Sequence, residues 1–406
     1  MKVIFIAGCY SVASEEKLRR LCRGKVGIQN APNAFQWSII KGLYECGADF
    51  ETFSFPWLPI FPLRFRRPYT FTDTLMLEDT CVGKMYPYCT VIGLKPLSIR
   101  NRLKKRIENY LKTVSNDEQI VLLLYSPLSY YLRTAIDIKK KYPNIKIAVI
   151  ITDLIDDAVN YKTNNTFLKR IQVREELKWQ QSSYCLIDKF ILLTKAMEER
   201  IPEAKGKSII VEGICDKITP ADYEKQESEI KQILYTGTLQ KYVGIDDFIN
   251  AFILTSNHNY RLIICGAGPS EDYINEMAKK DSRIIYKGVV PRQEALKLQQ
   301  ESTVVVNPRK PSEAITRYSF PSKTMEYLSS GTPMIGYKLE GIPEEYYSYF
   351  YSPVDMSDKS MALLIETVLS KPLSELVVKA QEAKSFVVNH KSPLIQVRRI
   401  LEFIGK

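Results

Sequence analysis

Short apolar runs alternate with longer stretches of mixed polarity along most of the chain. In the first half, runs such as 120–125 are far too short to span a membrane and fit strands buried in a parallel sheet. The stretches between these runs have the apolar spacing of helices. The predicted strands are 2–7, 49–55, 119–125, 146–151, 189–193 and 208–211. The predicted helices are 33–45, 99–114, 129–141 and 167–184, with a polar loop between the first strand and the first helix.

The same alternation resumes after a polar, charged segment at 212–230, which we interpret as a linker. The strands predicted beyond it are 232–235, 260–265, 283–286, 303–306 and 333–336. The helices predicted beyond it are 245–254, 270–279, 292–300 and 321–330, and 357–406 is expected to be largely helical.

Strands that alternate with helices predict an α/β fold with parallel sheets. A chain of 406 residues exceeds the usual size of a single core, so two domains are expected. We predict two doubly wound, Rossmann-like domains, 1–211 and 231–390, facing a central cleft. The last segment, 391–406, is expected to form a helix that can return to the first domain.

Three loops of the second half follow predicted strands: 235–241, 265–269 and 307–319. In open α/β sheets, ligands bind outside the carboxyl ends of the strands. Gly237, Gly266 and Gly268 would let a ligand approach the backbone closely. A glycine after a strand usually marks only a turn, but three such loops at one edge of a sheet form a stronger pattern.

The helix predicted at 321–330 carries an unusual cation. Ser319 and Ser322 are placed to cap its first turn. Lys323, in that turn, opposes the helix dipole, which favours negative charge there. A lysine beside free N–H groups is explained if an anion binds between them. Glu326 lies one turn on, and a hydroxyl-accepting carboxylate would suit a nucleotide or a phosphorylated sugar; the alternative is that the two residues form only an exposed ion pair.

Composition limits the remaining chemistry. With only two histidines, a histidine-based metal site or catalytic triad is not expected, and we predict no metal. Eight cysteines without a C-x-x-C pair indicate free, buried thiols in a reducing compartment. The residues up to Pro220 carry the whole net charge of +11, so nucleic acid, an anionic lipid surface or an anionic acceptor could each be the partner of the first half.

The segment 53–71 interleaves aromatic residues, prolines and arginines, among them Arg64, Arg66 and Arg67. Basic residues then follow one another along 97–112 (Arg100, Arg102, Lys104, Lys105 and Arg106). An aromatic and basic surface favours an anionic membrane interface. The alternatives are a proline-rich excursion that packs on its own domain beside a solvated basic helix, or aromatic stacking on nucleic acid, which no recognised motif supports. No signal peptide or spanning helix is predicted, so we expect a cytoplasmic protein that can lie on the inner face of the plasma membrane.

Three residues of the first half are candidates for contact with an acceptor. Asn33 suits the cap of the first helix, and Asn30 is a nearby hydrogen-bonding side chain, although both could serve turn and cap chemistry alone. Asp153 follows the strand 146–151, where its carboxylate could face the cleft or cap the next segment.

The second half resembles the retaining GT-B glycosyltransferases of family 4, which build bacterial polysaccharides. The stretches that carry this resemblance are 234–252 (LYTGTLQKYVGIDDFINAF), 262–269 (LIICGAGP), 286–290 (YKGVV) and 320–335. The resemblance implies a nucleotide-sugar donor held mainly by the second domain and an acceptor held by the first. Glu326 matches the second glutamate of the family's E-x7-E motif, which binds ribose hydroxyls. Gly237 matches the glycine loop near the diphosphate, and Val289 lies where the backbone meets the base.

The chain departs from the family pattern at three positions. The first glutamate of the motif falls on Tyr318, the usual arginine on Thr238 and the usual lysine on Val243. Lys323 is the expected replacement for the missing cations, supported by Arg317 or Lys241, and Glu313 could replace the missing acid. Lys323 and Glu313 are therefore the catalytic candidates. The residues expected to bind the donor are Gly237, Thr238, Lys241, Gly266, Gly268, Val289, Arg317, Tyr318, Ser319, Phe320, Ser322, Lys323 and Glu326.

The expected function is transfer of a hexosyl or related sugar from a UDP- or GDP-sugar to a glycan or lipid-linked acceptor, with retention of anomeric configuration. No cofactor and no nucleic-acid partner are expected. Another GT-B enzyme, an inverting transferase or a nucleotide-sugar epimerase, is one alternative; an inverting enzyme would need Asp153 as its general base. A non-catalytic GT-B subunit that partners an active transferase is the other.

Overall fold

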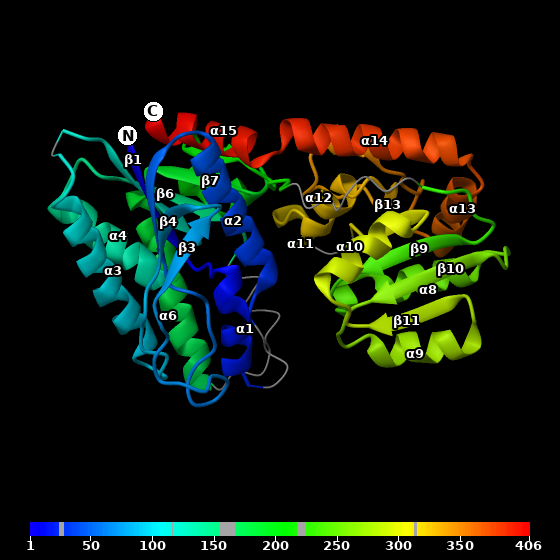
Figure 1. The fold of residues 1–406 in the computed structure, drawn as a ribbon, viewed down its shortest axis with the longest axis horizontal. Coiled ribbons are helices and arrows are strands. Elements are labelled where there is room, and N and C mark those ends of the chain that lie inside the picture. The colour runs from blue at the N-terminus through cyan, green and yellow to red at the C-terminus, as the bar shows by residue number, and fades with distance from the viewer. Residues whose placement is uncertain (24–27, 116, 155–166, 217–224, 312–314) are drawn as a thin grey trace. The chain divides into compact units, whose positions relative to one another are not determined.

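The structure, a computed structural model of the chain, describes residues 1–406 except 24–27, 116, 155–166, 217–224 and 312–314. The chain divides into two compact units (Figure 1). The N-terminal unit comprises Met1–Ile214 together with Pro393–Lys406, and the C-terminal unit comprises Cys215–Ser392. The boundary at Ile214 lies inside the segment interpreted as a linker.

The N-terminal unit is built on an eight-stranded sheet in the order β3-β4-β2-β1-β5-β6-β7-β8. All neighbouring strands are parallel except β3 and β4, which form an antiparallel hairpin. The strands are β1 (Lys2–Ala7), β2 (Asp49–Ser54), β3 (Asp73–Leu77), β4 (Thr80–Met85), β5 (Ile120–Tyr125), β6 (Lys146–Ile151), β7 (Lys189–Leu192) and β8 (Ser208–Ile210). The helices are α1 (Val12–Leu21), α2 (Asn30–Glu45), α3 (Lys95–Leu111), α4 (Ser129–Lys141), α6 (Phe167–Ser183), α7 (Met197–Arg200) and α15 (Pro393–Gly405).

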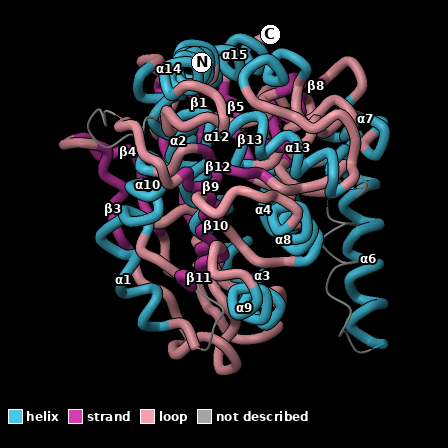
Figure 2. The backbone as a smooth tube through the Cα atoms, turned by 90° about the vertical axis from the view of Figure 1, so that its right-hand side faces the viewer, coloured by secondary structure: helices cyan, strands magenta, loops and turns pink. Residues whose placement is uncertain are grey.

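The C-terminal unit is built on a five-stranded sheet in the order β11-β10-β9-β12-β13, in which every neighbouring pair is parallel. Figure 2 shows these strands stacked in that order. Helix α8 packs against α9 and α13, and α12 packs against α14. The strands are β9 (Lys231–Thr236), β10 (Tyr260–Cys265), β11 (Ile284–Gly288), β12 (Val304–Asn307) and β13 (Met334–Gly336). The helices are α8 (Ile245–Ile253), α9 (Glu271–Lys280), α10 (Arg292–Glu301), α11 (Ile315–Tyr318), α12 (Ser322–Ser329), α13 (Asp358–Leu369) and α14 (Leu373–His390).

Helix α1, the β3–β4 hairpin and the short helix α7 of the N-terminal unit were not predicted. The segment expected to be a polar loop after β1 contains α1, whose first turn is capped by Ser11 and which buries only Ser14 and Leu18. So narrow a buried stripe gives little helical pattern in the sequence. The β3–β4 hairpin turns through two residues, Glu78 and Asp79, and Glu78 adopts a positive φ of 53°. A turn of this kind usually contains glycine or asparagine, so the sequence lacks the usual hairpin signal.

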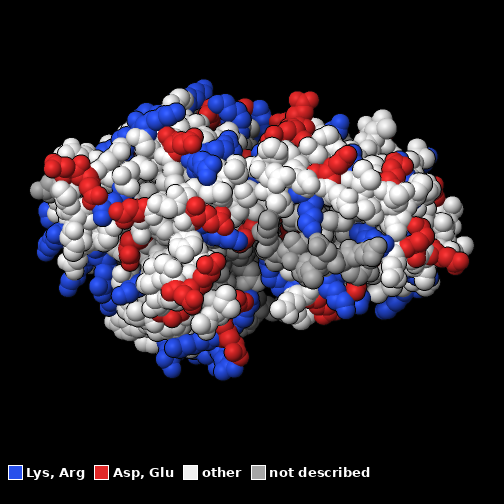
Figure 3. All heavy atoms as spheres, turned by 45° about the horizontal axis from the view of Figure 1, so that its top comes forward, with Lys and Arg blue, Asp and Glu red and all other residues white. Residues whose placement is uncertain are grey.

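The charge and cysteine predictions can be followed on the structure. On the face drawn in Figure 3, lysine and arginine side chains are denser over the N-terminal unit, on the left, than over the C-terminal unit. All eight cysteines are free, as predicted, but the expectation that they are buried holds for only four of them (Cys9, Cys89, Cys215 and Cys265), and Cys81 and Cys185 are exposed. Among the helices of the described residues, none has both the length and the apolar character needed to cross a membrane.

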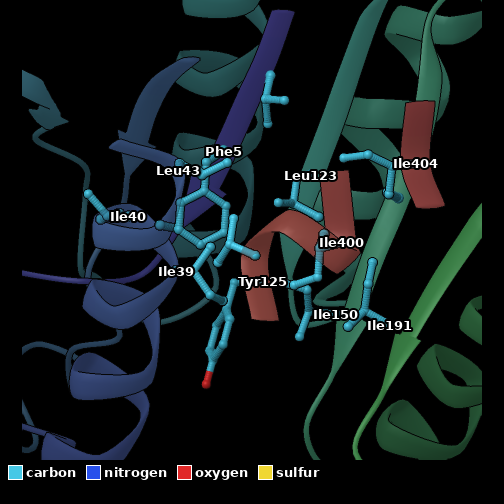
Figure 4. Packing of buried hydrophobic residues seen from close by; sticks show 14 of the residues in the cluster. Phe5, Ile39, Ile40, Leu43, Leu123, Tyr125, Ile150, Ile191, Ile400 and Ile404 are labelled. Carbon is cyan, nitrogen blue, oxygen red and sulfur yellow. The ribbon is translucent and has the colours of Figure 1, made fainter. Parts of the chain in front are cut away.

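The C-terminal helix α15 completes the core of the N-terminal unit. It packs beside α2, and Ile400 and Ile404 join Ile39 and Leu43 of α2 against the strands of the sheet (Figure 4). Because these side chains are almost completely buried, one face of the central strands depends on residues from both ends of the chain.

We therefore expect Ile400→Ala to lower the free energy of unfolding of the N-terminal unit by about 2–5 kcal/mol, because it leaves a cavity between α15 and the sheet. Urea unfolding followed by circular dichroism measures the change. Glu402→Ala, on the exposed side of the same helix, is the matched control and should change stability by less than about 0.5 kcal/mol. Equal effects of the two substitutions would contradict the packing described for α15.

Candidate functional site

The order of strands in the C-terminal unit creates a switch point at one position. From β9 the chain proceeds outward to β10 and β11 on one side, and then returns to place β12 and β13 on the other. The connections on the two sides of β9 therefore diverge, and in open α/β sheets ligands bind outside the carboxyl ends of the strands at such a position. The candidate site is the set of side chains that the structure brings to this position.

The loops after β9 and β10 are in close backbone contact at the carboxyl ends of the two strands. The backbone N–H of Gly237 donates to the carbonyl of Cys265 over 3.0 Å. Gly266 has a φ of +144°, and a Cβ atom there would lie 1.8 Å from the Gly237 carbonyl oxygen. A Cβ on Gly268 would lie 2.6 Å from the Leu239 backbone. These glycines are therefore required by contact between the loops; close approach of a ligand to them stays a prediction.

Helix α12 brings Lys323 to the end of β9. The helix starts at Ser322, and its cap residue is Pro321, which makes no side-chain hydrogen bond to the helix. The prediction that Ser319 and Ser322 cap this turn is therefore wrong, and the backbone N–H groups of the first turn have no such partner at the cap. Proline has a restricted φ that suits the entry to a helix, which explains why the helix starts here without a polar cap.

Four polar side chains meet at the switch point, and we call them the β9–α12 cluster: Thr236, Gln299, Lys323 and Glu326. The Lys323 ammonium lies 2.7 Å from Glu326 Oε1 and 3.4 Å from Thr236 Oγ1. The Gln299 amide, from α10, donates to the same Glu326 oxygen at 2.7 Å and to Thr236 Oγ1 at 3.1 Å. Among the described residues, Glu326 Oε2 has no hydrogen-bond partner.

A buried tyrosine anchors the cluster to the sheet. The Tyr327 hydroxyl accepts from the backbone N–H of Thr236 at 3.0 Å and donates to the Thr236 carbonyl at 3.1 Å. Tyr327 is completely buried. Since Tyr327 follows Glu326 directly, this contact fixes the helix turn that carries both charged side chains.

The electrostatics of the cluster keep Glu326 ionised. Burial alone would raise the pKa of the Glu326 carboxyl, but the adjacent Lys323 ammonium and the hydrogen bond from Gln299 outweigh it, and the pKa lies below its ordinary value. The side chains of Lys323 and Glu326 are 30% and 25% exposed. The ion pair that was one interpretation of these residues is thus present, but it is partly buried and tied to two further side chains.

The other cations near this edge differ in their contacts. Arg317 forms an ion pair with Glu340 at 2.9 Å, and Lys241 is exposed in the loop after β9. Arg309, which the sequence analysis missed, follows β12; it lies 3.4 Å from Ser319 Oγ and 5.5 Å from the centre of the Tyr242 ring. Glu313, a predicted catalytic residue, lies outside the described residues.

The remaining predicted donor residues occupy three environments. Val289 is 74% exposed just after β11, and Thr238 is exposed in the loop after β9, where its carbonyl accepts from the Tyr235 hydroxyl at 2.7 Å. Tyr318 is partly buried at the end of α11. Phe320 is buried and packs against Tyr346, with ring centres 5.5 Å apart, so it belongs to the core.

In the N-terminal unit, two predicted acceptor residues hold the loop after β1. Asn33 does not cap α2, which starts at Asn30; its Oδ1 accepts from the backbone N–H of Tyr10 at 2.9 Å. Asn30 Oδ1 accepts from the Tyr10 hydroxyl at 3.1 Å and from Arg19 at 2.8 Å. Asp153 is exposed and accepts from the Thr152 hydroxyl at 3.1 Å.

Sequence reasoning missed Thr236 and Gln299 for different reasons. Thr236 is the last residue of β9, next to the predicted glycine loop, and its position at a strand end could have indicated it. Gln299 lies in an ordinary polar helix sequence, and nothing in that sequence shows that its side chain is completely buried.

Part of the C-terminal unit matches a known protein family. Residues 230–370 match the family model described as glycosyl transferases group 1. No curated protein matches the chain. The matched region contains all four residues of the β9–α12 cluster.

Solved structures match the chain over its whole length. A structure described as trehalose-6-phosphate from E. coli, bound with UDP-2-fluoro glucose, has a TM-score of 0.65 at 8% identity and covers 100% of this chain and 99% of its own. HepE from Anabaena, in complex with UDP, has a TM-score of 0.60 at 11% identity, with 100% of both chains covered. TarM from S. aureus, in complex with UDP, has a TM-score of 0.62 at 10% identity, with 100% of both chains covered. The predicted fold class, two Rossmann-like α/β domains of the GT-B type, is confirmed.

The depressed pKa of Glu326 makes a testable contribution to stability. A carboxyl whose pKa is lower in the folded state than in the unfolded state stabilises the fold at pH values above its unfolded pKa, which is near 4.5. This contribution is lost as the pH falls through the pKa of the folded state. We expect wild type to be more stable than Glu326→Gln at neutral pH, and this difference to shrink below about pH 4.5. Urea unfolding at a series of pH values measures it. A difference that is constant from pH 3 to 7 would show that Glu326 is not held ionised by its neighbours.

Proposed function

We propose that the protein is a glycosyltransferase that uses a nucleoside-diphosphate sugar and transfers the sugar to a glycan or lipid-linked acceptor. The observation that carries this proposal is the β9–α12 cluster, which places a cation, uncapped helix N–H groups and a carboxylate together at the switch point of a domain that matches the group 1 glycosyltransferases. The cation and the N–H groups suit the diphosphate of a nucleotide sugar, and the carboxylate suits its ribose.

The donor diphosphate would lie at the start of α12. Backbone N–H groups at a helix start favour phosphate, and the helix dipole adds to the attraction. Lys323 is partly exposed and paired with Glu326, so a diphosphate would compete with the carboxylate for the ammonium. Glu326 Oε2 is then placed to accept a hydrogen bond from a ribose hydroxyl, the role that the family resemblance implies for this glutamate.

Catalysis would consist mainly of stabilising the leaving group. When the bond from the anomeric carbon to the diphosphate breaks, negative charge develops on the diphosphate oxygens, and preorganised cations and N–H groups oppose that charge. The acceptor oxygen bonds to the anomeric carbon as the bond to the diphosphate breaks, and the hydroxyl proton passes to the departing diphosphate. Retention of configuration and a part for Glu313 remain elements of the proposal, supported only by the resemblance to family 4.

The titles of two structural neighbours support the choice of donor to test first. Both HepE and TarM were solved in complex with UDP. We therefore propose a UDP-sugar as the first donor, with GDP-sugars as the alternative. Release of the nucleoside diphosphate in the presence of a panel of sugars and acceptors tests the proposal; a protein that binds no nucleotide sugar would instead be the non-catalytic subunit.

Lys323 provides the most direct mutational test. We expect Lys323→Ala to lower kcat/KM for the donor by about 100-fold or more, because a charge-stabilising group at a leaving group contributes roughly 3 kcal/mol. Lys297→Ala, which removes an exposed lysine from α10, is the control and should leave the rate near wild type. Turnover of Lys323→Ala within about twofold of wild type would remove Lys323 from the mechanism.

Gln299 tests how Glu326 is positioned. The hydrogen bond from Gln299 helps to lower the pKa of the Glu326 carboxyl, so Gln299→Met should raise that pKa and weaken donor binding by about tenfold. Donor binding weakens at low pH as Glu326 becomes protonated, and this acid limb of the pH profile should lie at higher pH in the variant than in wild type. Gln293→Met, at an exposed position of the same helix, should leave the limb unchanged. Weaker binding with an unmoved acid limb would indicate that Gln299 has only a structural role.

A further inference from the structure

Two turns of the N-terminal unit lie side by side, in the segments that follow β2 and β4. Phe61 and Val91 form an isolated parallel bridge, and the Phe61 N–H donates to the Thr90 carbonyl at 3.0 Å. Each residue is followed directly by a tight turn, 62–64 after Phe61 and 92–94 after Val91. The first turn of α3 continues from the second of these. We call this surface the paired-turn surface; it comprises residues 61–67 and 91–97.

Aliphatic side chains project from both turns. Leu63 is in the first turn, Ile92 and Leu94 are in the second, and Leu97 follows in α3. All four are between 54% and 68% exposed. Single exposed aliphatic residues are ordinary, but four of them on adjoining turns form an apolar patch of the kind that marks an interaction site.

The charged residues of the two turns, and of the sequence that flanks them, are basic. Arg64, Arg66 and Arg67 are exposed next to Leu63, and Arg23 reaches the same turn, where its side chain donates to the Pro62 carbonyl at 3.3 Å. No aspartate or glutamate occurs in residues 52–72 or 80–107. The patch therefore presents aliphatic side chains within a cationic rim.

The two turns are held in place by the interior. Phe65 is completely buried and forms a bridge with Cys22. The Thr90 hydroxyl donates to the Arg67 carbonyl at 2.6 Å, and the Lys95 ammonium donates to the Leu58 carbonyl at 2.6 Å. The aliphatic and basic side chains are thus presented by a preformed surface that need not order itself on binding.

This surface differs from the one that the sequence suggested. Phe53, Phe55 and Leu58 are buried, so most of the aromatic segment 53–71 packs in the core as the alternative interpretation stated. On α3, Arg100 pairs with Asp137 at 2.7 Å, and Arg106 lies over the Tyr86 ring at 4.8 Å. The exposed apolar residues come instead from the paired turns.

We propose that the paired-turn surface docks the protein on an anionic lipid bilayer. The four aliphatic side chains would enter the boundary between headgroups and acyl chains, while the arginines lie at the level of the lipid phosphates. An aromatic platform for stacking bases is not what the surface offers, and the absence of acidic residues from 52–72 and 80–107 matches an anionic partner. This inference concerns the N-terminal unit alone and does not rest on the proposed glycosyl transfer.

Co-sedimentation of the full chain with vesicles tests it. Wild type should bind vesicles that contain phosphatidylglycerol and should not bind vesicles of phosphatidylcholine alone. Arg64→Gln, Arg66→Gln and Arg67→Gln together should weaken binding on the order of a hundredfold, about fivefold for each charge near the surface. Leu63→Ser, Ile92→Ser and Leu94→Ser together should weaken it at least about tenfold.

Matched controls change the same kinds of residue on the C-terminal unit. Lys279→Gln, Lys297→Gln and Lys359→Gln remove the same net charge, and Val354→Ser, Leu363→Ser and Val378→Ser remove exposed aliphatic side chains. Both controls should bind as wild type does. Circular dichroism and thermal unfolding verify that each variant is folded; if a triple serine variant is not, Leu63→Ser alone replaces it.

Three results would overturn the proposal. The first is absence of wild-type binding to anionic vesicles. The second is equal loss in the arginine variant and in the lysine control, which would show a response to net charge alone. The third is undiminished binding of the serine variant, which would leave an electrostatic surface for an acidic protein or nucleic acid.

Discussion

The contact between Thr236 and α12 is the constraint on which the candidate site depends. A completely buried tyrosine, Tyr327, uses its hydroxyl to bond both backbone groups of Thr236. This contact joins the carboxyl end of β9 to a helix that lies some ninety residues further along the chain. This contact holds the helix turn that carries the lysine and the glutamate against the end of β9.

A cation at the start of a helix is unfavourable, and the cluster shows how the protein accommodates one. Lys323 opposes the helix dipole, but Glu326 lies one turn on and Gln299 holds that carboxylate by a second hydrogen bond. The ammonium is therefore neutralised and oriented before a ligand arrives. An incoming diphosphate would replace one anionic partner of the ammonium by another, so the ammonium would not have to be moved from water. Preorganisation of this kind is usually the largest single contribution to transition-state stabilisation in charged sites.

The sequence predicted the parts of this arrangement that depend on local pattern. Four of the five strands of the C-terminal sheet, all except the edge strand β11, are largely buried and form short apolar runs in the sequence. The positions of the strands, the loops after β9 and β10, and the helix that carries Lys323 therefore followed from spacing. The ion pair of Lys323 with Glu326 was one of the two interpretations, but the contacts with Thr236 and Gln299 did not follow, because the burial of Gln299 and the bond from Tyr327 to Thr236 arise only when α10 and α12 pack on the same strand. Helix α1 and the β3–β4 hairpin were missed because neither has a broad apolar stripe or a usual turn residue. The cap of α12 was assigned to serine on local rules, whereas proline occupies it.

The central claim is that a nucleoside diphosphate binds at the carboxyl end of β9 and the start of α12. Hydrogen–deuterium exchange of the full chain, measured with and without UDP and with and without GDP, tests it most directly. We predict that at least one of the two nucleotides slows exchange of the backbone amides in the loop after β9 and in the first turn of α12, and that Lys323→Ala abolishes this protection. Binding of a nucleotide that protects neither segment, or absence of binding by both nucleotides, would contradict the account.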